Sequence, residues 1–187
     1  PRWVTADPTA LKADCTKNNL DCDIQNAGGS TTKMESIANQ MEAEGVKALM
    51  IVDLDQASGA KIEQQAKKDG LIVVDYDRLT PAGGADLYVS FDNVKVGELQ
   101  ARYLVDHAPK DHPLRIVRLN GAPTDNNAKL FKQGQDNVLD PLIQAGTVKI
   151  IFEDWCADWK PENGKKVTNA ALTRFGHDFD ALVTALM

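Results

Sequence analysis

Short apolar runs alternate with longer amphipathic stretches along the chain, and this alternation constrains the fold more than any other feature. Residues 48–52 (ALMIV) form a continuous apolar run, and residues 31–44 place apolar side chains at i, i+3, i+4 and i+7. Such spacing predicts an amphipathic helix, and a continuous apolar run is typical of a strand buried on both faces. The other expected strands are 71–74, 88–91, 116–119, 148–152 and 181–183, and the other expected helices are 58–68, 94–107, 127–139 and 161–173. The repeated strand-helix-strand order predicts an α/β fold with parallel sheets.

The charge balance argues against a nucleic-acid partner. The chain has 21 Lys and Arg residues against 27 Asp and Glu residues, a formal net charge of −6, spread along its length. Phosphate binding usually needs a basic patch that releases counterions. No apolar run approaches the roughly 18–20 residues of a membrane span, and no basic segment followed by an apolar one marks a leader peptide. The 187 residues allow one ordinary domain or two small ones.

Motifs for catalysis, cofactors and metals are weak or missing. The sequence has no GxGxxG, GxxxxGK[ST], GxSxG or HExxH pattern, and its three histidines are scattered. Asp53 and Asp55 suggest a cation site, but Asp55 before Ser58 is better interpreted as the start of a helix. We therefore expect neither a cofactor nor a bound metal. A small α/β enzyme using Asp77 or Cys156 stays open as an alternative, although no base or orienting group is evident.

The segments that follow the expected strands carry the candidate binding residues, because parallel strands place ligand sites at their carboxyl ends. Asp77 and Arg78 follow the strand 71–74. A carboxylate beside a guanidinium can accept from and donate to a polyol, since each hydroxyl is both donor and acceptor. The alternative is a structural ion pair. In residues 120–127 turn residues run into a helix start, so one interpretation of their Asn and Asp side chains is a helix cap. The excess of amides beyond what one cap needs indicates ligand contact.

Two tryptophans, Trp155 and Trp159, occur in an expected polar loop after the strand 148–152. An indole face packs on the apolar CH patches of a sugar ring while neighbouring polar groups bind its hydroxyls. Core packing is the alternative for each tryptophan taken alone. The recurrence of aromatic and acidic residues at strand ends favours a carbohydrate site.

The cysteines leave two alternatives open. Cys15 and Cys22 lie seven residues apart, which fits a local disulfide in an oxidising compartment or two half-buried thiols. Neither cysteine has a partner pattern typical of a zinc site. Cys156 has no activating histidine nearby in the sequence, so a catalytic thiol has little support.

The chain resembles the sugar-binding proteins of bacterial ABC transporters, in the xylose-binding-like branch of the type I periplasmic-binding-protein family. The resemblance covers essentially the whole chain, and its motifs in this order are more specific than any one alone. They are Arg2-Trp3, residues 45–52, YDRL (76–79), YVSFDN (88–93), GAPTDNNAK (121–129) and DWKPEN (158–163). It implies two α/β lobes that close on a monosaccharide, an ABC permease in the membrane as partner, and no catalysis. It also implies an extracytoplasmic location, periplasmic or as a cell-surface lipoprotein, which favours the Cys15–Cys22 disulfide.

The resemblance also assigns roles to individual residues. Its sugar contacts fall on Arg2, Asp77, Arg78, Asn127 and Trp159, with Trp3 and Trp155 as second contacts or wall residues. A further contact, usually an arginine, aligns with Lys132, which keeps the charge but loses the bidentate fork.

The expected fold is therefore two doubly wound parallel-sheet lobes that lack the family's first strand and C-terminal part. Residues 1–92 would form lobe one and residues 93–187 lobe two, with Asp92 and Asn93 at the first crossing. Family members begin with a strand before Arg-Trp and carry an Asn-Asp contact after the last strand, and this sequence has neither. A LacI-type regulator domain is an alternative, but it would need a helix-turn-helix headpiece, which the acidic N-terminal region lacks.

Overall fold

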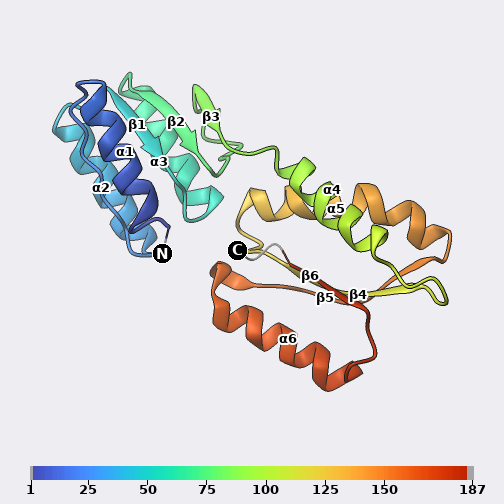
Figure 1. The fold of residues 1–187 in the computed structure, drawn as a ribbon. Helices are drawn as coiled ribbons and strands as arrows, with labels where there is room; N and C mark the ends of the chain where they lie inside the picture. Colours follow the sequence, from blue (N-terminus) through green and yellow to red (C-terminus); the bar gives the residue numbers. More distant parts are fainter. Residues whose placement is uncertain (1, 185–187) are drawn as a thin grey trace.

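The protein folds into two α/β units, each built on its own sheet. The computed structural model describes residues 2–184, so Pro1 and residues 185–187 of the expected lobes lie outside the described residues. Figure 1 shows that the two units are joined by the connection between β3 and α4. In chain order the elements are α1 (Ala6–Lys17), α2 (Thr31–Ala43), β1 (Ala48–Ile51), α3 (Gln56–Lys68), β2 (Ile72–Tyr76), β3 (Leu87–Val89), α4 (Asn93–Asp106), β4 (Leu114–Asn120), α5 (Asn126–Gln144), β5 (Val148–Trp155), η1 (Ala157–Trp159), α6 (Pro161–Phe175) and β6 (Ala181–Thr184).

The first sheet has the strand order β1-β2-β3, and all its pairs are parallel. Helices α2 and α3 cover one face of it and contact each other. The shared core contains Met34, Ala38, Met41, Leu49, Ile51, Ile62, Ala66, Leu71 and Val73. Asp55 caps α3, because its carboxylate accepts hydrogen bonds from the backbone N–H groups of Ala57 and Ser58, which confirms the helix-start interpretation.

The opposite face of the first sheet carries exposed apolar side chains. Met50 is 52% exposed, and Ile72 and Leu87 are each 57% exposed. Burial alternates along β1, so the expectation that residues 48–52 form a strand buried on both faces is wrong. Successive side chains of a strand point to opposite faces, and within residues 2–184 only the face toward α2 and α3 is packed against helices along the length of β1.

The second sheet has the order β5-β4-β6, again with parallel pairs, which confirms the α/β class and its parallel sheets. Figure 1 shows α4 and α5 on one side of this sheet and α6 on the other. The central strand β4 is buried at six of its seven positions. Ile116 packs toward the α4 and α5 side, whereas Val117 packs toward α6, so this sheet is covered on both faces.

Two glycines allow α4 and α5 to approach closely. A Cβ atom on Gly97 would lie 2.1 Å from the backbone oxygen of Phe131, and one on Gly134 would lie 2.0 Å from that of Val94. The close packing brings the first turns of the two helices together, so that Asn93 Nδ2 donates to Asn127 Oδ1 at 3.0 Å. The helix pair thus positions two buried amides beside the candidate site.

A disulfide joins Cys15 in α1 to Cys22 in the segment that follows it. Helix α1 has no buried residues, so packing contributes little to holding it. Among the described residues no helix is long and apolar enough to cross a membrane.

Removal of this disulfide is expected to loosen α1 selectively. In the double variant Cys15→Ser, Cys22→Ser we expect the free energy of opening of α1 to fall by about 2 kcal/mol, because the cross-link restricts the open state of a short loop. Native-state hydrogen exchange of the α1 amides measures this change, and the α2 amides serve as the internal control. Equal protection of α1 in both proteins would contradict the prediction.

Candidate functional site

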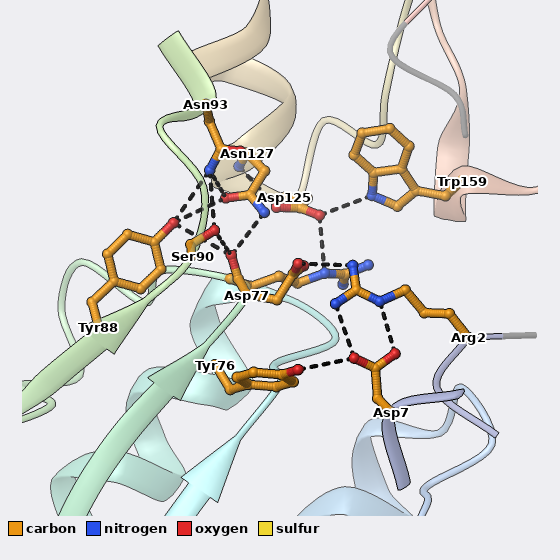
Figure 2. A network of polar contacts seen from close by, with 11 residues as sticks. Arg2, Asp7, Tyr76, Asp77, Tyr88, Ser90, Asn93, Asp125, Asn127 and Trp159 are labelled. Atoms are coloured by element: carbon orange, nitrogen blue, oxygen red, sulfur yellow. Dashed lines mark hydrogen bonds and ion pairs between the residues drawn. The ribbon is translucent and has the colours of Figure 1, made fainter. Parts of the chain in front are cut away.

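A connected group of polar side chains lies at the carboxyl ends of strands from both sheets. Figure 2 shows it as one network that includes Arg2, Asp77, Asp125, Asn127 and Trp159. Asp77 follows β2, Asp125 and Asn127 follow β4, and Trp159 lies in η1 after β5. The topology therefore gathers residues that are 157 positions apart in sequence, as expected for the loop edge of parallel sheets.

Arg2 joins the start of the chain to the end of β2. Its Nε and Nη2 donate to the two carboxylate oxygens of Asp7 at 2.9 and 3.1 Å, and its Nη1 donates to Asp77 Oδ1 at 3.0 Å. The hydrogen bonds to Asp7 raise the pKa of Arg2, against the effect of burial, so the guanidinium stays charged. It lies 4.1 Å from the ring centroid of Trp3, which in turn meets Tyr76 edge-on.

Asp77 has a strained backbone, and its carbonyl oxygen accepts more than one hydrogen bond. Its φ of 69° falls in the left-handed region, which non-glycine residues seldom adopt. The carbonyl oxygen accepts from Ser90 Oγ at 2.7 Å and from Asn127 Nδ2 at 2.9 Å. Burial raises the pKa of the Asp77 carboxyl, whereas Arg2 opposes that rise. The bond from Asn127 links the end of β2 to the start of α5, and so connects the two sheets.

Arg78 and Asp125 form a buried ion pair between the two units. Arg78 Nε lies 3.0 Å from Asp125 Oδ2, with side-chain exposures of 15% and 2%. Arg78 Nη1 also donates to the backbone oxygen of Asp53 at 2.9 Å. Asp125 caps α5 through the N–H of Asn127 at 2.9 Å and accepts from Trp159 Nε1 at 2.9 Å. One carboxylate therefore orients a cation, a helix start and an aromatic ring.

The indole of Trp159 is held at a defined place. Its φ is 57°, an uncommon value for a bulky residue. A Cβ atom on Gly121 would lie 2.0 Å from the indole ring, so only glycine allows the ring to pack there. The ring is thus positioned by Gly121 on one face and by Asp125 at its nitrogen.

A buried amide cluster completes the network. Asn93 and Asn127 are 4% and 6% exposed, and Tyr88 stands next to both. Tyr88 OH lies 3.4 Å from Asn127 Oδ1, and Asn93 Nδ2 donates to Tyr88 OH at 3.3 Å. Burial raises the pKa of Tyr88, so its hydroxyl stays protonated at neutral pH. These bonds fix the orientation of Asn127.

Lys132 and Trp155 lie apart from this network. Within residues 2–184 no hydrogen bond or ion pair joins either side chain to Arg2, Arg78 or Asp125. Both instead line a hollow of about 450 Å³. The other residues of this hollow are Pro123, Lys129, Gln133, Asp136 and Asn137.

The expectation of a polar loop directly after residue 152 is wrong, because β5 continues to Trp155. Glu153 and Asp154 stay in the strand, since β4 extends to Asn120 and pairs with them up to Trp155. Trp155 therefore belongs to the sheet, and only Trp159 lies in the segment beyond it. The sequence pattern ended the strand too early because it followed apolar residues only.

An ion network that the sequence did not reveal borders the hollow. Arg118 is 3% exposed and donates to Asp136 Oδ1 at 2.5 Å and to Glu153 Oε2 at 2.7 Å. Lys132 Nζ lies 2.7 Å from Asp136 Oδ2, and Asn120 Nδ2 donates to Glu153 Oε1 at 2.8 Å. Burial tends to raise the pKa of Glu153, but the bonds from Arg118 and Asn120 outweigh it and lower that pKa. Lys132 Nζ also lies 3.7 Å from Glu153 Oε1, so two carboxylates hold this side chain.

Asp125 is the main site residue that sequence reasoning missed. The pattern of residues 120–127 indicated a helix cap, and Asp125 is a cap, but nothing local predicts its bonds to Arg78 and Trp159. The described residues contain no group of His, Cys, Asp and Glu that could hold a metal ion. Burial raises the pKa of the Cys156 thiol, which disfavours the reactive thiolate.

Comparison with known proteins identifies the family. The model of the periplasmic binding protein domain matches residues 1–186. The chain belongs to the periplasmic binding protein domain family. This confirms the resemblance noted from the sequence.

Relatives within this family share substantial identity. The D-xylose-binding periplasmic protein of Escherichia coli (strain K12) is 39% identical over 163 residues, which cover 87% of this chain and 48% of that protein. The multiple sugar-binding periplasmic receptor ChvE of Rhizobium radiobacter is 37% identical over 146 residues, 71% of this chain and 41% of that protein. The chain spans about half the length of the relatives that it matches.

Solved structures agree with the fold of this family. A solute-binding protein of an ABC transporter from Clostridium phytofermentans, with bound β-D-glucose, matches with a TM-score of 0.88 at 26% identity. The match covers 98% of this chain and 60% of that one. A carbohydrate transporter solute-binding protein from Chloroflexus aurantiacus, in complex with D-glucose, has a TM-score of 0.71 at 31% identity over 90% of this chain and 51% of that one.

Proposed function

We propose that this chain is part of the sugar-binding component of an ABC transporter and that it binds a monosaccharide between its two α/β units. The observation that carries the proposal is the polar network at the strand ends, in which Arg78 pairs with Asp125 and Asn127 binds the carbonyl oxygen of Asp77. Both contacts join one unit to the other. A ligand that reached them would touch both units at once.

The chemistry of the network suits a sugar. Arg2 and Arg78 offer guanidinium forks, Asp77 and Asp125 offer carboxylates, and Asn127 offers an amide that both donates and accepts. Each sugar hydroxyl needs such a combination because it is both donor and acceptor. Trp159 adds a flat apolar ring for the CH groups of the sugar. Strained backbone at Asp77 and Trp159 is typical of functional sites.

We assign the remaining candidates outer positions. Trp3, under the guanidinium of Arg2, would form a wall of the site. Lys132 and Trp155 would contact the sugar from the side of the hollow that they line. Lys132 would have to share its charge with Asp136 and Glu153, so we expect it to contribute less than Arg78.

A xylose-like aldose is the preferred ligand in this proposal. Two relatives that carry the name D-xylose-binding periplasmic protein are 39% and 37% identical to this chain. Others are named multiple sugar-binding proteins, and a structural neighbour holds β-D-glucose. Epimers differ by one hydroxyl, so the preference depends on a few hydrogen bonds.

We further propose a transport context. The two lobes would be residues 1–92 and 93–187, and ligand contacts made only in the closed state would favour a hinge motion between them. The closed form would deliver the sugar to a membrane permease from an extracytoplasmic location, periplasmic or at the cell surface. The role would be binding without catalysis, as the names of the relatives suggest.

Titration calorimetry of the full-length protein tests this function. We expect micromolar or tighter binding of at least one of D-xylose, D-glucose, D-galactose and D-ribose, with D-xylose among the tightest. L-xylose is the matched control, because it has the same groups in mirror-image positions. If no aldose bound below millimolar concentration while an activity assay showed turnover, the enzyme alternative would replace the transport function.

A further inference from the structure

A buried acidic cluster lies beneath the loop that carries Asp77 and Arg78. It consists of Asp53 after β1, Glu63 in α3, and Asp75 in β2, and these are 3%, 0% and 1% exposed. Thr80, at 2% exposure, belongs to the loop itself and completes the cluster. None of these side chains is explained by the polar network described above.

The hydrogen bonds of this cluster are incomplete. Asp75 Oδ2 accepts from the backbone N–H of Thr80 at 2.8 Å. Asp75 Oδ1, both carboxyl oxygens of Glu63 and Thr80 Oγ1 are buried without a hydrogen bond of regular geometry. Two ionised carboxylates cannot donate to each other, and a buried polar atom without a partner is costly. A proton on Glu63 would turn one of these oxygens into a donor and give Asp75 Oδ1 a partner.

The packing leaves Glu63 little freedom. A Cβ atom on Gly83 would lie 1.9 Å from Glu63 Oε2, and one on Gly59 would lie 3.1 Å from Thr80 Oγ1. The two glycines let the loop and α3 close over the cluster. The carboxyl group of Glu63 interacts there with the side chains of Thr80 and Asp75.

The surrounding charges favour a proton at Glu63. Burial raises the pKa of Glu63 to about 7, with Asp75 and Asp53 adding to the rise and Thr80 opposing it. Burial likewise raises the pKa of Asp53 to about 7, where Arg78 opposes the rise and Asp125, Asp75 and Asp55 add to it. In the described part of the chain, several carboxylates but only one cation, Arg78, act on this cluster, so its net charge favours a bound proton.

We propose that a protonated Glu63 donates a hydrogen bond to Asp75 and so positions the loop that presents Asp77 and Arg78 to the ligand. The path is short: Glu63 holds Asp75, Asp75 holds the N–H of Thr80, and the loop between them carries the two site residues. Glu63 is a positioning residue, because it acts through Asp75. The role at the ligand rests on the proposed sugar-binding function.

The sign of the pH dependence follows from the raised pKa. The folded state keeps the proton on Glu63 above the pH at which the unfolded chain loses it. The stabilisation is therefore complete below about pH 4.5, declines as the pH rises, and is lost on passing about pH 7. Ordering of the loop should follow the same course.

The test uses the full-length protein with Glu63→Gln, Glu63→Leu and the control Glu44→Gln, which changes an exposed carboxylate in the residue after α2. The amide of Glu63→Gln is always neutral and can donate to Asp75, whereas leucine cannot. Three readouts are needed: the carbon-13 shift of the Glu63 carboxyl against pH, hydrogen exchange of the Thr80 amide corrected for its intrinsic rate, and the Kd for D-xylose.

We expect the Glu63 carboxyl to titrate near pH 7 and the protection of Thr80 to fall about tenfold on going from pH 6 to pH 8 in the wild type and in Glu44→Gln. Glu63→Gln should keep its protection, and its Kd should change less than about twofold over this range. Glu63→Leu should lose protection at both values. Titration of the Glu63 carboxyl near pH 4.5, or equal pH profiles for the wild type and Glu63→Gln, would overturn the proposal.

Failure of the two proposals can be told apart. If no sugar binds to the wild type at any pH, the proposed function fails, while the carbon-13 titration and the Thr80 protection still decide whether Glu63 positions the loop. If sugar binds with a Kd that rises with pH in the wild type but stays flat in Glu63→Gln, both proposals are supported. If Glu63→Leu does not fold, Glu63→Gln and the wild-type titration give the answer.

Discussion

Arg78→Ala is expected to weaken sugar binding by at least about 100-fold, which corresponds to about 2.7 kcal/mol. The substitution removes the cation that pairs with Asp125 across the two units and leaves that carboxylate buried at 2% exposure. Truncation of one partner of a buried charge pair typically costs about 2–5 kcal/mol. The backbone oxygen of Asp53 also loses its donor. Titration calorimetry with D-xylose measures the loss.

Arg102→Ala is the matched control. Arg102 lies in α4 at 58% side-chain exposure and reaches Glu98 only at 3.8 Å, so its loss should leave the Kd within about twofold. Arg78→Lys should fall between the wild type and Arg78→Ala, because lysine keeps the charge without the planar fork. A Kd for Arg78→Ala equal to that of Arg102→Ala would remove Arg78 from the site.

Trp159→Ala should reduce sugar affinity by about 10- to 100-fold and abolish most of the change in tryptophan fluorescence that sugar causes in the wild type. The variant loses the flat ring and also frees Asp125 Oδ2 from the bond donated by the indole nitrogen. Gly121→Ala should act in the same direction, because its new Cβ atom would lie 2.0 Å from the ring and displace it. Fluorescence titration and calorimetry together measure both effects.

Tyr103→Ala provides the control for the loss of an aromatic side chain. Tyr103 lies in α4, is 64% exposed and stacks on His107, well outside the polar network. The sugar affinity and the fluorescence response of Tyr103→Ala should match those of the wild type. A full fluorescence response in Trp159→Ala would assign the signal to Trp3 or Trp155 and refute the role given to Trp159.

The periodicity of the sequence predicts most helices because they bury one apolar face, whereas α1 has no buried residues and was not predicted. The prediction fails where polar residues continue a strand and where apolar residues are exposed. Glu153 and Asp154 continue β5 because backbone pairing with β4 decides the length of the strand, and the paired charge of Arg118 stabilises Glu153 there. Met50 is apolar but exposed, because it lies on the face of the first sheet opposite α2 and α3. An apolar run in the sequence does not tell which face of a strand is covered by helices.

The candidate site was predictable where a residue follows a strand, as Asp77, Arg78 and Asn127 do. Asp125 also follows a strand, but its role as the cap of α5 accounts for it locally, and its bonds to Arg78 and Trp159 span distant parts of the chain. Glu63 was equally hidden, since a glutamate in an amphipathic helix usually faces water. In the structure its side chain is fully buried, with Gly83 packed against the carboxylate.

The left-handed backbone at Asp77 and Trp159 has a consequence for any attempt to engineer this protein. Such conformations cost about 1–3 kcal/mol each, and the rest of the fold must supply that energy. Glycine at either position would relieve the strain but delete the side chain that we propose contacts the ligand. Thermal robustness and ligand recognition therefore compete at the same two residues, and gains in robustness have to be sought elsewhere in the chain.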